Sequence, residues 1–572
     1  MSPQHTFFLV LAVGLPSLAD AALDISGVGS ELERNVRAFV ALDDEPCDAE
    51  EWLVRRRYRA LEKQTRESLE PFGYYDPSIS TQLTLGADCW QATLEIEPGE
   101  PVRYRSVDIA ISGEAATDPA FDDLPRRDAL QIGQVLRHAD YDALKRQLQT
   151  LAADRGYLEA EFIESRLEVW PETGAADVTL HFTSGPRYSF GEILIEQSFL
   201  DPKVARGYID LEPGTPYDSA ELARIQRDLS SSAYFGAVDI APDLQRAVDG
   251  RVPIRIALQP GIRIEYTVGV GASPDTGARL RLGFRNNRLN DSGHRIIADA
   301  NVSSVLQGVT AEYRIPRRDP RREWFSIASA VSKEATDTFD TDVQRLGLRW
   351  TKVMGETWLR TLSLDLSNES FEIGDEIETS RFVVPGIAFD QKVADRDIFP
   401  TRGRRLGAEI RGTDEAIGST TSYAQATVWA RWIRSIGDKN RLLLRANAGA
   451  IASRDFNLLP PSVRFFAGGD ESVRGYDYDS LGPKDADGNV IGGTNLLVAS
   501  VEFERHLGGN FYGAVFVDSG NAFDNTDFDP ETGAGIGVKW RSPIGLVRLY
   551  LGYPVTADDR KVRFHLRLGA DL

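Results

Sequence analysis

The sequence is poor in the side chains that most often carry catalysis or bind metals. Its 572 residues include only two cysteines and six histidines, and the histidines are scattered along the chain. It contains no Gly-x-Ser-x-Gly turn, no phosphate-binding Gly-rich loop and no His-Glu-x-x-His pair. Acidic pairs such as Asp43-Asp44 are typical of solvated loops. We therefore predict no catalytic site, no cofactor and no metal.

The chain also lacks positive charge and long apolar runs. It has 65 Lys and Arg against 86 Asp and Glu, a formal charge of −21, which argues against a nucleic-acid-binding surface. The mean hydropathy is −0.28, and beyond the N-terminal segment nothing approaches the roughly 20 apolar residues of a membrane helix. A transmembrane β-barrel remains possible, because its strands alternate polar and apolar residues and escape a hydropathy average.

Residues 1–21 have the pattern of a secretory signal. An apolar run from Phe7 to Leu15 is broken by Pro16, and Ala19-Asp20-Ala21 follows as a small-x-small cleavage site. The run is too short to anchor the chain in a bilayer. We therefore predict that 1–21 is a signal peptide and that the rest of the chain is exported.

The two cysteines, Cys47 and Cys89, both lie in the first hundred residues. In an exported chain, a disulfide is the expected state of such a pair. A metal site is the weaker alternative, because no histidine lies between them and two ligands are too few. We predict a structural Cys47–Cys89 disulfide.

Residues 22–261 contain a threefold repeat. Each copy ends in an alternating strand followed by a glycine (Gly99, Gly185 or Gly261), and arginine and tyrosine come within a few residues of each glycine. Repeats of this length are small domains rather than solenoid units. The predicted module boundaries are 22–100, 101–186 and 187–261.

Within each module the periodicity predicts the order strand, helix, helix, strand, strand. The second helices are expected over residues 50–71, 141–155 and 219–231. In the first module, the first helix is expected to bury the face formed by Leu32, Val36, Phe39 and Val40. These apolar stripes indicate core packing rather than a ligand site.

From residue 262 to 572 the helical periods disappear, and strands of about ten residues alternate between turn clusters. In the last strand, Val562, Phe564, Leu566 and Leu568 interleave with Arg563, His565 and Arg567. One face is uniformly apolar, which suits lipid, and the other suits a wet lumen. An arginine on the lipid face would cost about 2–4 kcal/mol near the midplane, so the arginines are expected inside. A soluble β-sandwich is the alternative.

Residues 464–478 differ from a simple surface turn. The run Arg-Phe-Phe-Ala-Gly-Gly-Asp-Glu-Ser-Val-Arg-Gly-Tyr-Asp-Tyr carries aromatics, arginines and acids among small residues, where a turn contains mostly Gly, Pro, Asn, Asp and Ser. Gly468, Gly469 and Gly475 allow backbone conformations that other residues resist. This composition indicates a packed internal loop, and a long hairpin loop with a charged tip is the alternative.

The segment Val473-Arg474-Gly475-Tyr476 resembles the signature of the outer-membrane insertase superfamily that includes BamA and TamA. The longer run from Arg464 to Tyr476, with Gly-Ala-Val-Phe-Val-Asp-Ser-Gly at 513–520, resembles the TamA branch in particular. The resemblance implies α+β POTRA modules, which bind polypeptide in the periplasm, followed by an all-β antiparallel transmembrane β-barrel. It implies about 16 strands and an internal loop around 464–480. Three modules is the number in the TamA branch.

The resemblance also implies that this loop is locked to the barrel wall. In the superfamily, the matching arginine docks the loop against an aromatic residue and an acid of one barrel strand. The corresponding loop-lock residues here are Val473, Arg474, Gly475, Tyr476, Phe516 and Asp518. By its residues alone, Asp518 also fits a strand-end turn in Asp-Ser-Gly.

The implied function is insertion or assembly of outer-membrane proteins, including autotransporter-type clients, through a lateral gate between the first and last barrel strands. The implied gate residues are Ile264, Tyr266, Val268, Phe564, Leu566 and Leu568. The implied location is the outer membrane, with the modules in the periplasm. The implied partners are a TamB-like periplasm-spanning protein, unfolded outer-membrane clients and outer-membrane lipids, with no nucleic acid.

Three alternatives remain open. A two-partner secretion transporter has two modules and a plug helix after its signal. A BamA-like core insertase carries more modules than three. A passive porin or a barrel enzyme belongs to a different class and leaves about 240 residues of N-terminal modules without a role.

Overall fold

The computed structural model describes residues 22–86, 89–124, 127–273, 277–374, 376–542, 545–558, 560–569 and 571. The predicted signal peptide, 1–21, lies outside these residues. The chain divides into two compact units: residues up to 193 with 211–223 and 242–254, and residues 194–210 with 224–241 and 255–572. Among the described helices, none is both long and apolar enough to cross a membrane.

Three modules precede the barrel, and each contains a three-stranded sheet in which the last strand lies in the middle. In the first two sheets the central strand runs parallel to the first strand and antiparallel to the second. The first module comprises β1 (Ala22–Ser26), α1 (Ser30–Phe39), α2 (Glu51–Leu69), β2 (Ser78–Leu85) and β3 (Trp90–Glu97). The second comprises β4 (Arg103–Ser112), α3 (His138–Arg155), β5 (Glu161–Trp170) and β6 (Ala175–Thr183). The third comprises β7 (Ser189–Glu196), α4 (Pro202–Arg206), α5 (Ser219–Ser231), β8 (Phe235–Pro242) and β9 (Arg251–Pro260).

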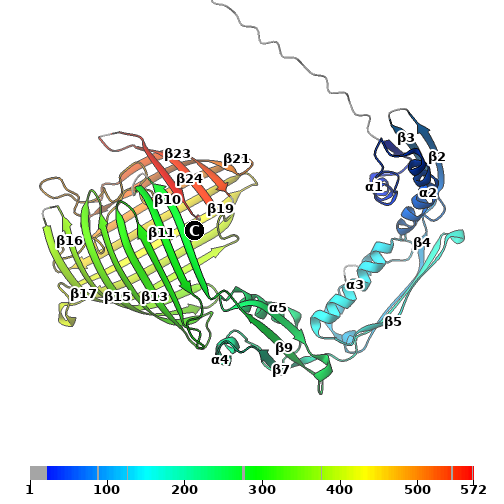
Figure 1. The fold of residues 1–572 in the computed structure, drawn as a ribbon, viewed down its shortest axis with the longest axis horizontal. Coiled ribbons are helices and arrows are strands. Elements are labelled where there is room, and N and C mark those ends of the chain that lie inside the picture. The colour runs from blue at the N-terminus through cyan, green and yellow to red at the C-terminus, as the bar shows by residue number, and fades with distance from the viewer. Residues whose placement is uncertain are drawn as a thin grey trace, which may run out of the picture. The chain divides into compact units, whose positions relative to one another are not determined.

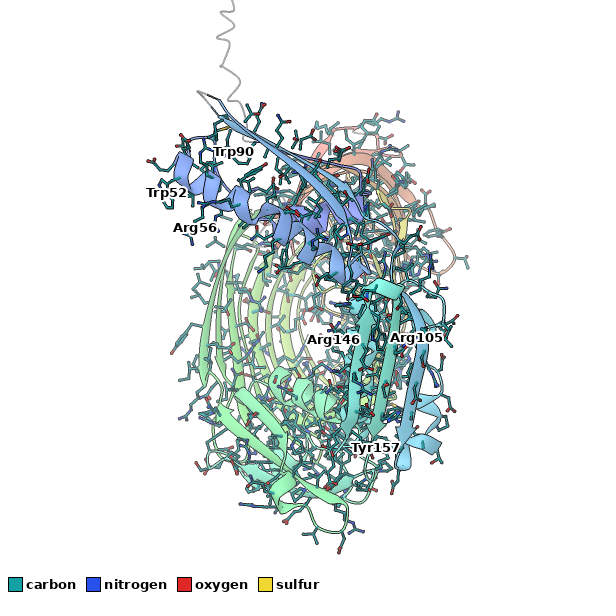
Figure 2. The ribbon with its side chains drawn as sticks, turned by 90° about the vertical axis from the view of Figure 1, so that its right-hand side faces the viewer. Trp52, Arg56, Trp90, Arg105, Arg146 and Tyr157 are labelled. Atoms are coloured by element: carbon teal, nitrogen blue, oxygen red, sulfur yellow. A yellow bond between two sulfur atoms is a disulfide. The ribbon has the colours of Figure 1, made fainter. Side chains whose placement is uncertain are left out.

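In the first module, a disulfide joins Cys47, in the connection between α1 and α2, to Cys89, directly before β3. Next to it, the Trp90 indole N–H donates to the carbonyl of Pro46 (3.1 Å); Figure 2 labels Trp90 on its strand. The disulfide therefore ties the connection between the two helices to the central strand of this sheet. The expected burial of Phe39 is wrong: it is 49% exposed, whereas Val36 is fully buried. Val36 and Val40 are one helical turn apart and both lie in the core, whereas the side chain of Phe39, the last residue of α1, points away from that face.

The second module departs from the predicted order, because short 3₁₀ turns replace its first helix. These turns span Glu114–Thr117 and Pro119–Phe121. Proline supplies no N–H to a helix, and the Asp118 carboxylate instead accepts from the backbone N–H of Ala120 (3.1 Å). Phe121, the last residue of the second turn, packs in the core of the module.

Asp118 is also the centre of a polar cluster in this module. It accepts from the Arg155 guanidinium (2.7 and 2.9 Å) and from the Tyr157 hydroxyl (3.0 Å). Burial disfavours the charged form, but the bonds from Arg155, Ala120 and Tyr157 outweigh it and hold the pKa of Asp118 below its usual value. The cluster joins the turn to the C-terminal end of α3.

Part of the third module packs on turns of the barrel. The backbone N–H of Asp201 donates to the carbonyl of Asp291 (2.8 Å), and the Arg295 guanidinium lies 3.9 Å from the ring centroid of Tyr234. Asp228 of α5 pairs with Arg321. These contacts lie within the second compact unit and fix this part of the module to the barrel.

The remaining residues form a 16-stranded antiparallel sheet in chain order, from β10 to β25, which curves into a barrel (green to red in Figure 1). The predicted all-β antiparallel barrel is therefore confirmed. Its strands are β10 (Ile264–Ser273), β11 (Gly277–Asn286), β12 (Arg295–Val302), β13 (Leu306–Pro316), β14 (Glu323–Ala335), β15 (Phe339–Met354), β16 (Trp358–Ile373), β17 (Glu376–Ala394), β18 (Arg402–Thr413), β19 (Tyr423–Ile436), β20 (Asn440–Ser453), β21 (Asn495–Gly508), β22 (Phe511–Phe523), β23 (Glu531–Ser542), β24 (Gly545–Pro554) and β25 (Arg563–Leu568).

The expected strand length of about ten residues is wrong for the middle of the sheet. Strands β15 and β16 have 16 residues and β17 has 19, whereas β25 has six. Crossing the hydrocarbon takes about 9–11 residues, so the long strands extend beyond it. Along β22, Val515 and Val517 are half exposed on the outer face while Ala514, Phe516 and Asp518 are buried inside. The barrel interior is therefore the polar face.

Candidate functional site

The connection between β20 and β21, residues 454–494, folds back into the barrel. Its backbone is bridged across the loop, with Phe465 opposite Gly493 and Ala467 opposite Leu481. Arg464 is buried, with 4% of the residue exposed. Its guanidinium donates to the carbonyls of Leu459 (2.6 Å), Ile491 (3.0 Å) and Asn457 (2.9 Å). The loop is thus internally cross-linked before it reaches the barrel wall.

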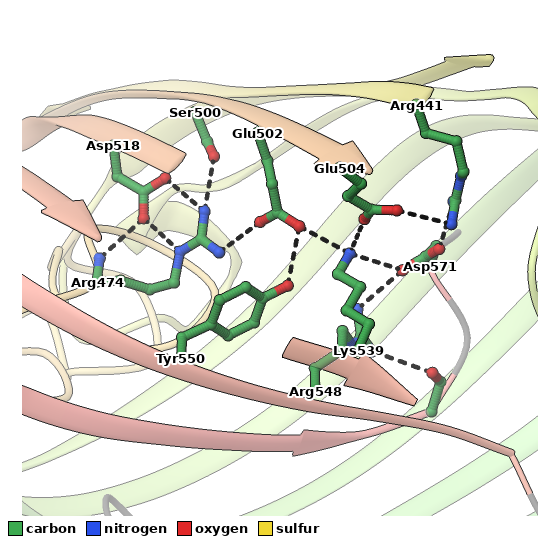
Figure 3. A network of polar contacts seen from close by, with 11 residues as sticks. Arg441, Arg474, Ser500, Glu502, Glu504, Asp518, Lys539, Arg548, Tyr550 and Asp571 are labelled. Carbon is green, nitrogen blue, oxygen red and sulfur yellow. Dashed lines mark hydrogen bonds and ion pairs between the residues drawn. The ribbon is translucent and has the colours of Figure 1, made fainter. Parts of the chain in front are cut away.

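Arg474 attaches this loop to the wall. Its Nε and Nη2 donate to the two carboxylate oxygens of Asp518 (2.7 and 2.9 Å), and its backbone N–H donates to the same group (3.0 Å). Its Nη1 donates to Glu502 (2.5 Å). Arg474 and Asp518 are 5% and 0% exposed, so this is a buried, bidentate ion pair between a loop and a strand (Figure 3).

Two aromatic rings enclose the Arg474 guanidinium. Its central carbon lies 3.5 Å from the ring centroid of Phe516 and 4.6 Å from that of Tyr550. The Tyr550 hydroxyl donates to Glu502 (2.9 Å). A guanidinium held between rings and carboxylates keeps its charge compensated without water.

The neighbouring motif residues pack against the last strands. Gly475 has φ 101°, which favours glycine, and a Cβ there would lie 3.0 Å from the backbone of Tyr553. Its N–H donates to His565 Nε2 on β25 (3.0 Å). The Tyr476 hydroxyl donates to Glu531 (2.7 Å), and Val473 is fully buried.

The structure also brings in a group of charged residues that sequence reasoning missed. Lys539 on β23 pairs with Glu502 (2.7 Å), with Glu504 and with Asp571 (3.5 Å). Arg441 on β20 pairs with Glu504 (2.9 Å) and Asp571 (2.6 Å). Figure 3 shows this network continuing from the Arg474 pair across several strands. The alternation Val501-Glu502-Phe503-Glu504 was the available signal for two inward-facing acids.

Small residues of β23 make room for the loop, and these were also missed. A Cβ at Gly533 would lie 1.8 Å from the carbonyl oxygen of Arg474, and a Cβ at Gly535 would lie 2.6 Å from the Phe516 ring. No side chain fits at Gly533 without moving the loop. Gly533 therefore makes room for the backbone of the motif, whereas Gly535 and Gly537 make room for the rings of Phe516 and Tyr550.

The seam between β10 and β25 differs from every other neighbouring pair in the sheet. Among the described residues, each consecutive pair of strands shares a ladder, but β10 and β25 share none. Some of their residues nevertheless lie within 8 Å, Cα to Cα. In the part of the chain that the structure describes, the two strands are therefore close but unpaired.

Side-chain exposure is consistent with this open edge. Tyr266 and Val268 on β10 are 76% and 70% exposed, whereas Leu346 and Leu348, on a strand with neighbours at both sides, are 47% and 42% exposed. The other expected gate residues lie on the same two strands: Ile264 pairs with Asn286 of β11, and Phe564, Leu566 and Leu568 pair with residues of β24. The backbone N–H and C=O groups along the seam edges have no ladder partner among the described residues.

Comparison with known proteins identifies this arrangement. The model of the Omp85 superfamily domain matches residues 266–571, more than half of the chain. The chain belongs to the Omp85 superfamily. The model of the first POTRA domain of TamA matches residues 22–98, which contain the disulfide-linked module.

Two curated relatives of this Omp85 protein are each named outer membrane protein assembly factor BamA. The one from Nitratidesulfovibrio vulgaris is 24% identical over 444 residues, which cover 73% of this chain and 55% of the relative. The one from Neisseria meningitidis serogroup B is 22% identical over 594 residues, covering 91% of this chain and 74% of the relative. The chain thus spans about half of the first relative's length.

One solved structure shares the fold of this Omp85 chain. The crystal structure of BamA from Haemophilus ducreyi lacking POTRA domains 1–3 superposes with a TM-score of 0.69 at 16% identity. The superposition covers 82% of this chain and 99% of the other. It supports POTRA modules followed by a 16-stranded barrel.

Proposed function

We propose that this Omp85 protein is an outer-membrane protein assembly factor of the TamA type. It acts without enzymatic chemistry in the outer membrane, with its POTRA modules in the periplasm. The observation that carries the proposal is the seam, where the described residues of β10 and β25 lie close together without a ladder. The match of residues 22–98 to the first POTRA domain of TamA favours this branch.

The unpaired edges give the seam its mechanism. An unpaired backbone N–H or C=O costs several kcal/mol in hydrocarbon. A client strand is therefore stabilised when it pairs with an exposed edge of the seam before it enters the bilayer. The client's own folding supplies the driving force. The Arg474 lock holds the lumenal loop against β22 and, through Gly475, against β25, so the loop stays beside the seam during this exchange.

The POTRA modules are proposed to receive unfolded outer-membrane clients, autotransporters among them, and to bind a TamB-like periplasm-spanning partner. Co-purification tests the partner. The full-length protein, solubilised from membranes of its own host, is expected to retain a large TamB-like protein, and a variant without residues 22–100 is expected to lose it. Recovery of the barrel with small lipoproteins only, and no TamB-like protein, would contradict the TamA assignment.

A core assembly factor of the BamA type is the second candidate, and the names of the two curated relatives favour it. Depletion in the host distinguishes the two. Loss of a core factor lowers the level of many outer-membrane proteins together, whereas loss of a TamA-type factor is expected to affect a small set of autotransporter-type clients.

A further inference from the structure

Three arginines of different strands meet at the tip of the lumenal loop. Arg431 of β19 donates to one carboxylate oxygen of Glu471 (2.6 Å), and Arg567 of β25 pairs with the other. Arg445 of β20 donates to the carbonyl of Ser472 (2.5 Å). Arg431 and Arg445 stand directly opposite each other in the β19–β20 ladder. Like charges in that position destabilise a sheet unless an anion lies between them.

The acids around this cluster are committed elsewhere. Asp470 pairs with His565, and Asp518 accepts the bidentate pair from Arg474, with Arg445 no closer than 4.0 Å. Glu502 and Asp571 are held by Arg474, Lys539, Arg441 and Arg548. Within the described residues, Glu471 is thus the acid that Arg431 and Arg567 share, and its side chain is 57% exposed. Arg445 contacts the backbone carbonyl of the next residue, Ser472.

A cavity opens beside the cluster. It measures about 70 Å³ and is lined by all three arginines together with Asp470, Arg474 and His565, among others. One water needs about 10–15 Å³ of such space, so a tetrahedral oxyanion has room. Guanidinium groups bind phosphate oxygens through paired N–H bonds, whereas Glu471 offers Arg431 and Arg567 one oxygen each.

We propose that Arg431, Arg445 and Arg567 form a binding site for a phosphate group, which the tethered carboxylate of Glu471 occupies in this structure. An arriving phosphate displaces Glu471 and removes one link between the loop and β25. The phosphate comes either from a lipid headgroup or from free phosphate, and both satisfy the same donors. This site goes beyond the proposed assembly function and stands independently of it.

The test measures thermal unfolding of the purified full-length protein in detergent, titrated with inorganic phosphate at constant ionic strength. Glu471→Gln removes the negative charge that competes with phosphate, so phosphate is expected to raise the unfolding midpoint of this variant by about 2–4 °C. The matched control is Glu415→Gln, which removes another exposed loop acid paired with an arginine, Arg454 (3.5 Å). The control is expected to respond to phosphate no more than the wild type.

Arginine variants in the Glu471→Gln background check the donors. Arg445→Gln is expected to raise the phosphate concentration needed for a half-maximal shift at least about tenfold. Arg445→Lys keeps the charge and is expected to preserve part of the phosphate response. The proposal is overturned if Glu471→Gln responds like Glu415→Gln, or if Arg445→Gln leaves the response unchanged.

A lipid titration then identifies the source of the phosphate. A short-chain phosphatidic acid that acts at concentrations about tenfold below inorganic phosphate, with no effect of the matching diacylglycerol, assigns a lipid headgroup. Equal potency of the two phosphates assigns free phosphate. Either result supports the site.

Discussion

Removing the Arg474 side chain is the sharpest test of the loop lock. In Arg474→Ala, Asp518 loses two of the three hydrogen bonds that Arg474 donates to it, and its side chain is fully buried. The nearest remaining cation is Arg445, at 4.0 Å. Breaking a buried pair from one side costs about 3–5 kcal/mol, because the other charge is left uncompensated. We expect a loss in that range.

The reverse substitution is expected to cost less. In Asp518→Ala, Arg474 keeps Glu502 (2.5 Å) and the rings of Phe516 and Tyr550, so about 2–4 kcal/mol is expected. The two residues touch, so the double variant should lose less than the sum of the single losses, with a coupling of about 1–3 kcal/mol. The exposed pair Arg454–Glu415, 3.5 Å apart, is the matched control, and its coupling should stay below about 0.5 kcal/mol.

Chemical unfolding of the folded barrel, followed by tryptophan fluorescence, measures these free energies. The shift in gel mobility between unheated and heated samples gives an independent reading of barrel integrity. Client assembly in cells should fall with both single variants. The reasoning is refuted if Arg474→Ala stays within about half a kcal/mol of the wild type, or if two damaging single variants prove strictly additive.

Three further predictions concern the other features. Replacing both cysteines of the first module by serine should lower the free energy of unfolding of this module by about 2–4 kcal/mol and leave the barrel unchanged. Unfolding of the purified variant and of the wild type, each with and without reductant, measures this loss. Cysteines placed at Val268 and Leu566 should cross-link across the seam and stop client assembly until a reductant is added; full activity of a confirmed cross-link would contradict the lateral gate. Hydrogen bonds from Arg155, Ala120 and Tyr157 outweigh the effect of burial and hold the pKa of Asp118 below its usual value. Its contribution to stability is therefore present above about pH 4 and is lost as the pH falls through the lowered pKa. Asp118→Asn should therefore flatten the acid side of the second module's stability curve, and an unchanged curve would argue against the cluster with Arg155.

The alternation of residues was enough to place the inner and outer faces of the barrel strands. Val515 and Val517 face outward and Phe516 and Asp518 inward because successive side chains of a strand point to opposite faces, and this period is visible in the sequence. The three repeats can also be read from the sequence, and with only two cysteines in the chain a single disulfide pairing is available. The helix order of the second module was predicted wrongly, because the segment around Pro119 forms 3₁₀ turns instead of the expected helix.

Which charges meet inside the barrel was decided only by the tertiary structure. Strand register sets Ser500 opposite Asp518 and Glu502 opposite Phe516, and the return of the loop then brings Arg474 to both acids. Lys539 of β23 joins the network by pairing with Glu502 and with Asp571, which follows β25. Period-two alternation depends on neighbouring residues alone, whereas a buried ion-pair network depends on register and loop closure between residues tens of positions apart. For that reason the sequence alone determined the inner and outer faces of the barrel strands of this Omp85 protein, whereas only the tertiary structure determined how Arg474 attaches the loop to them.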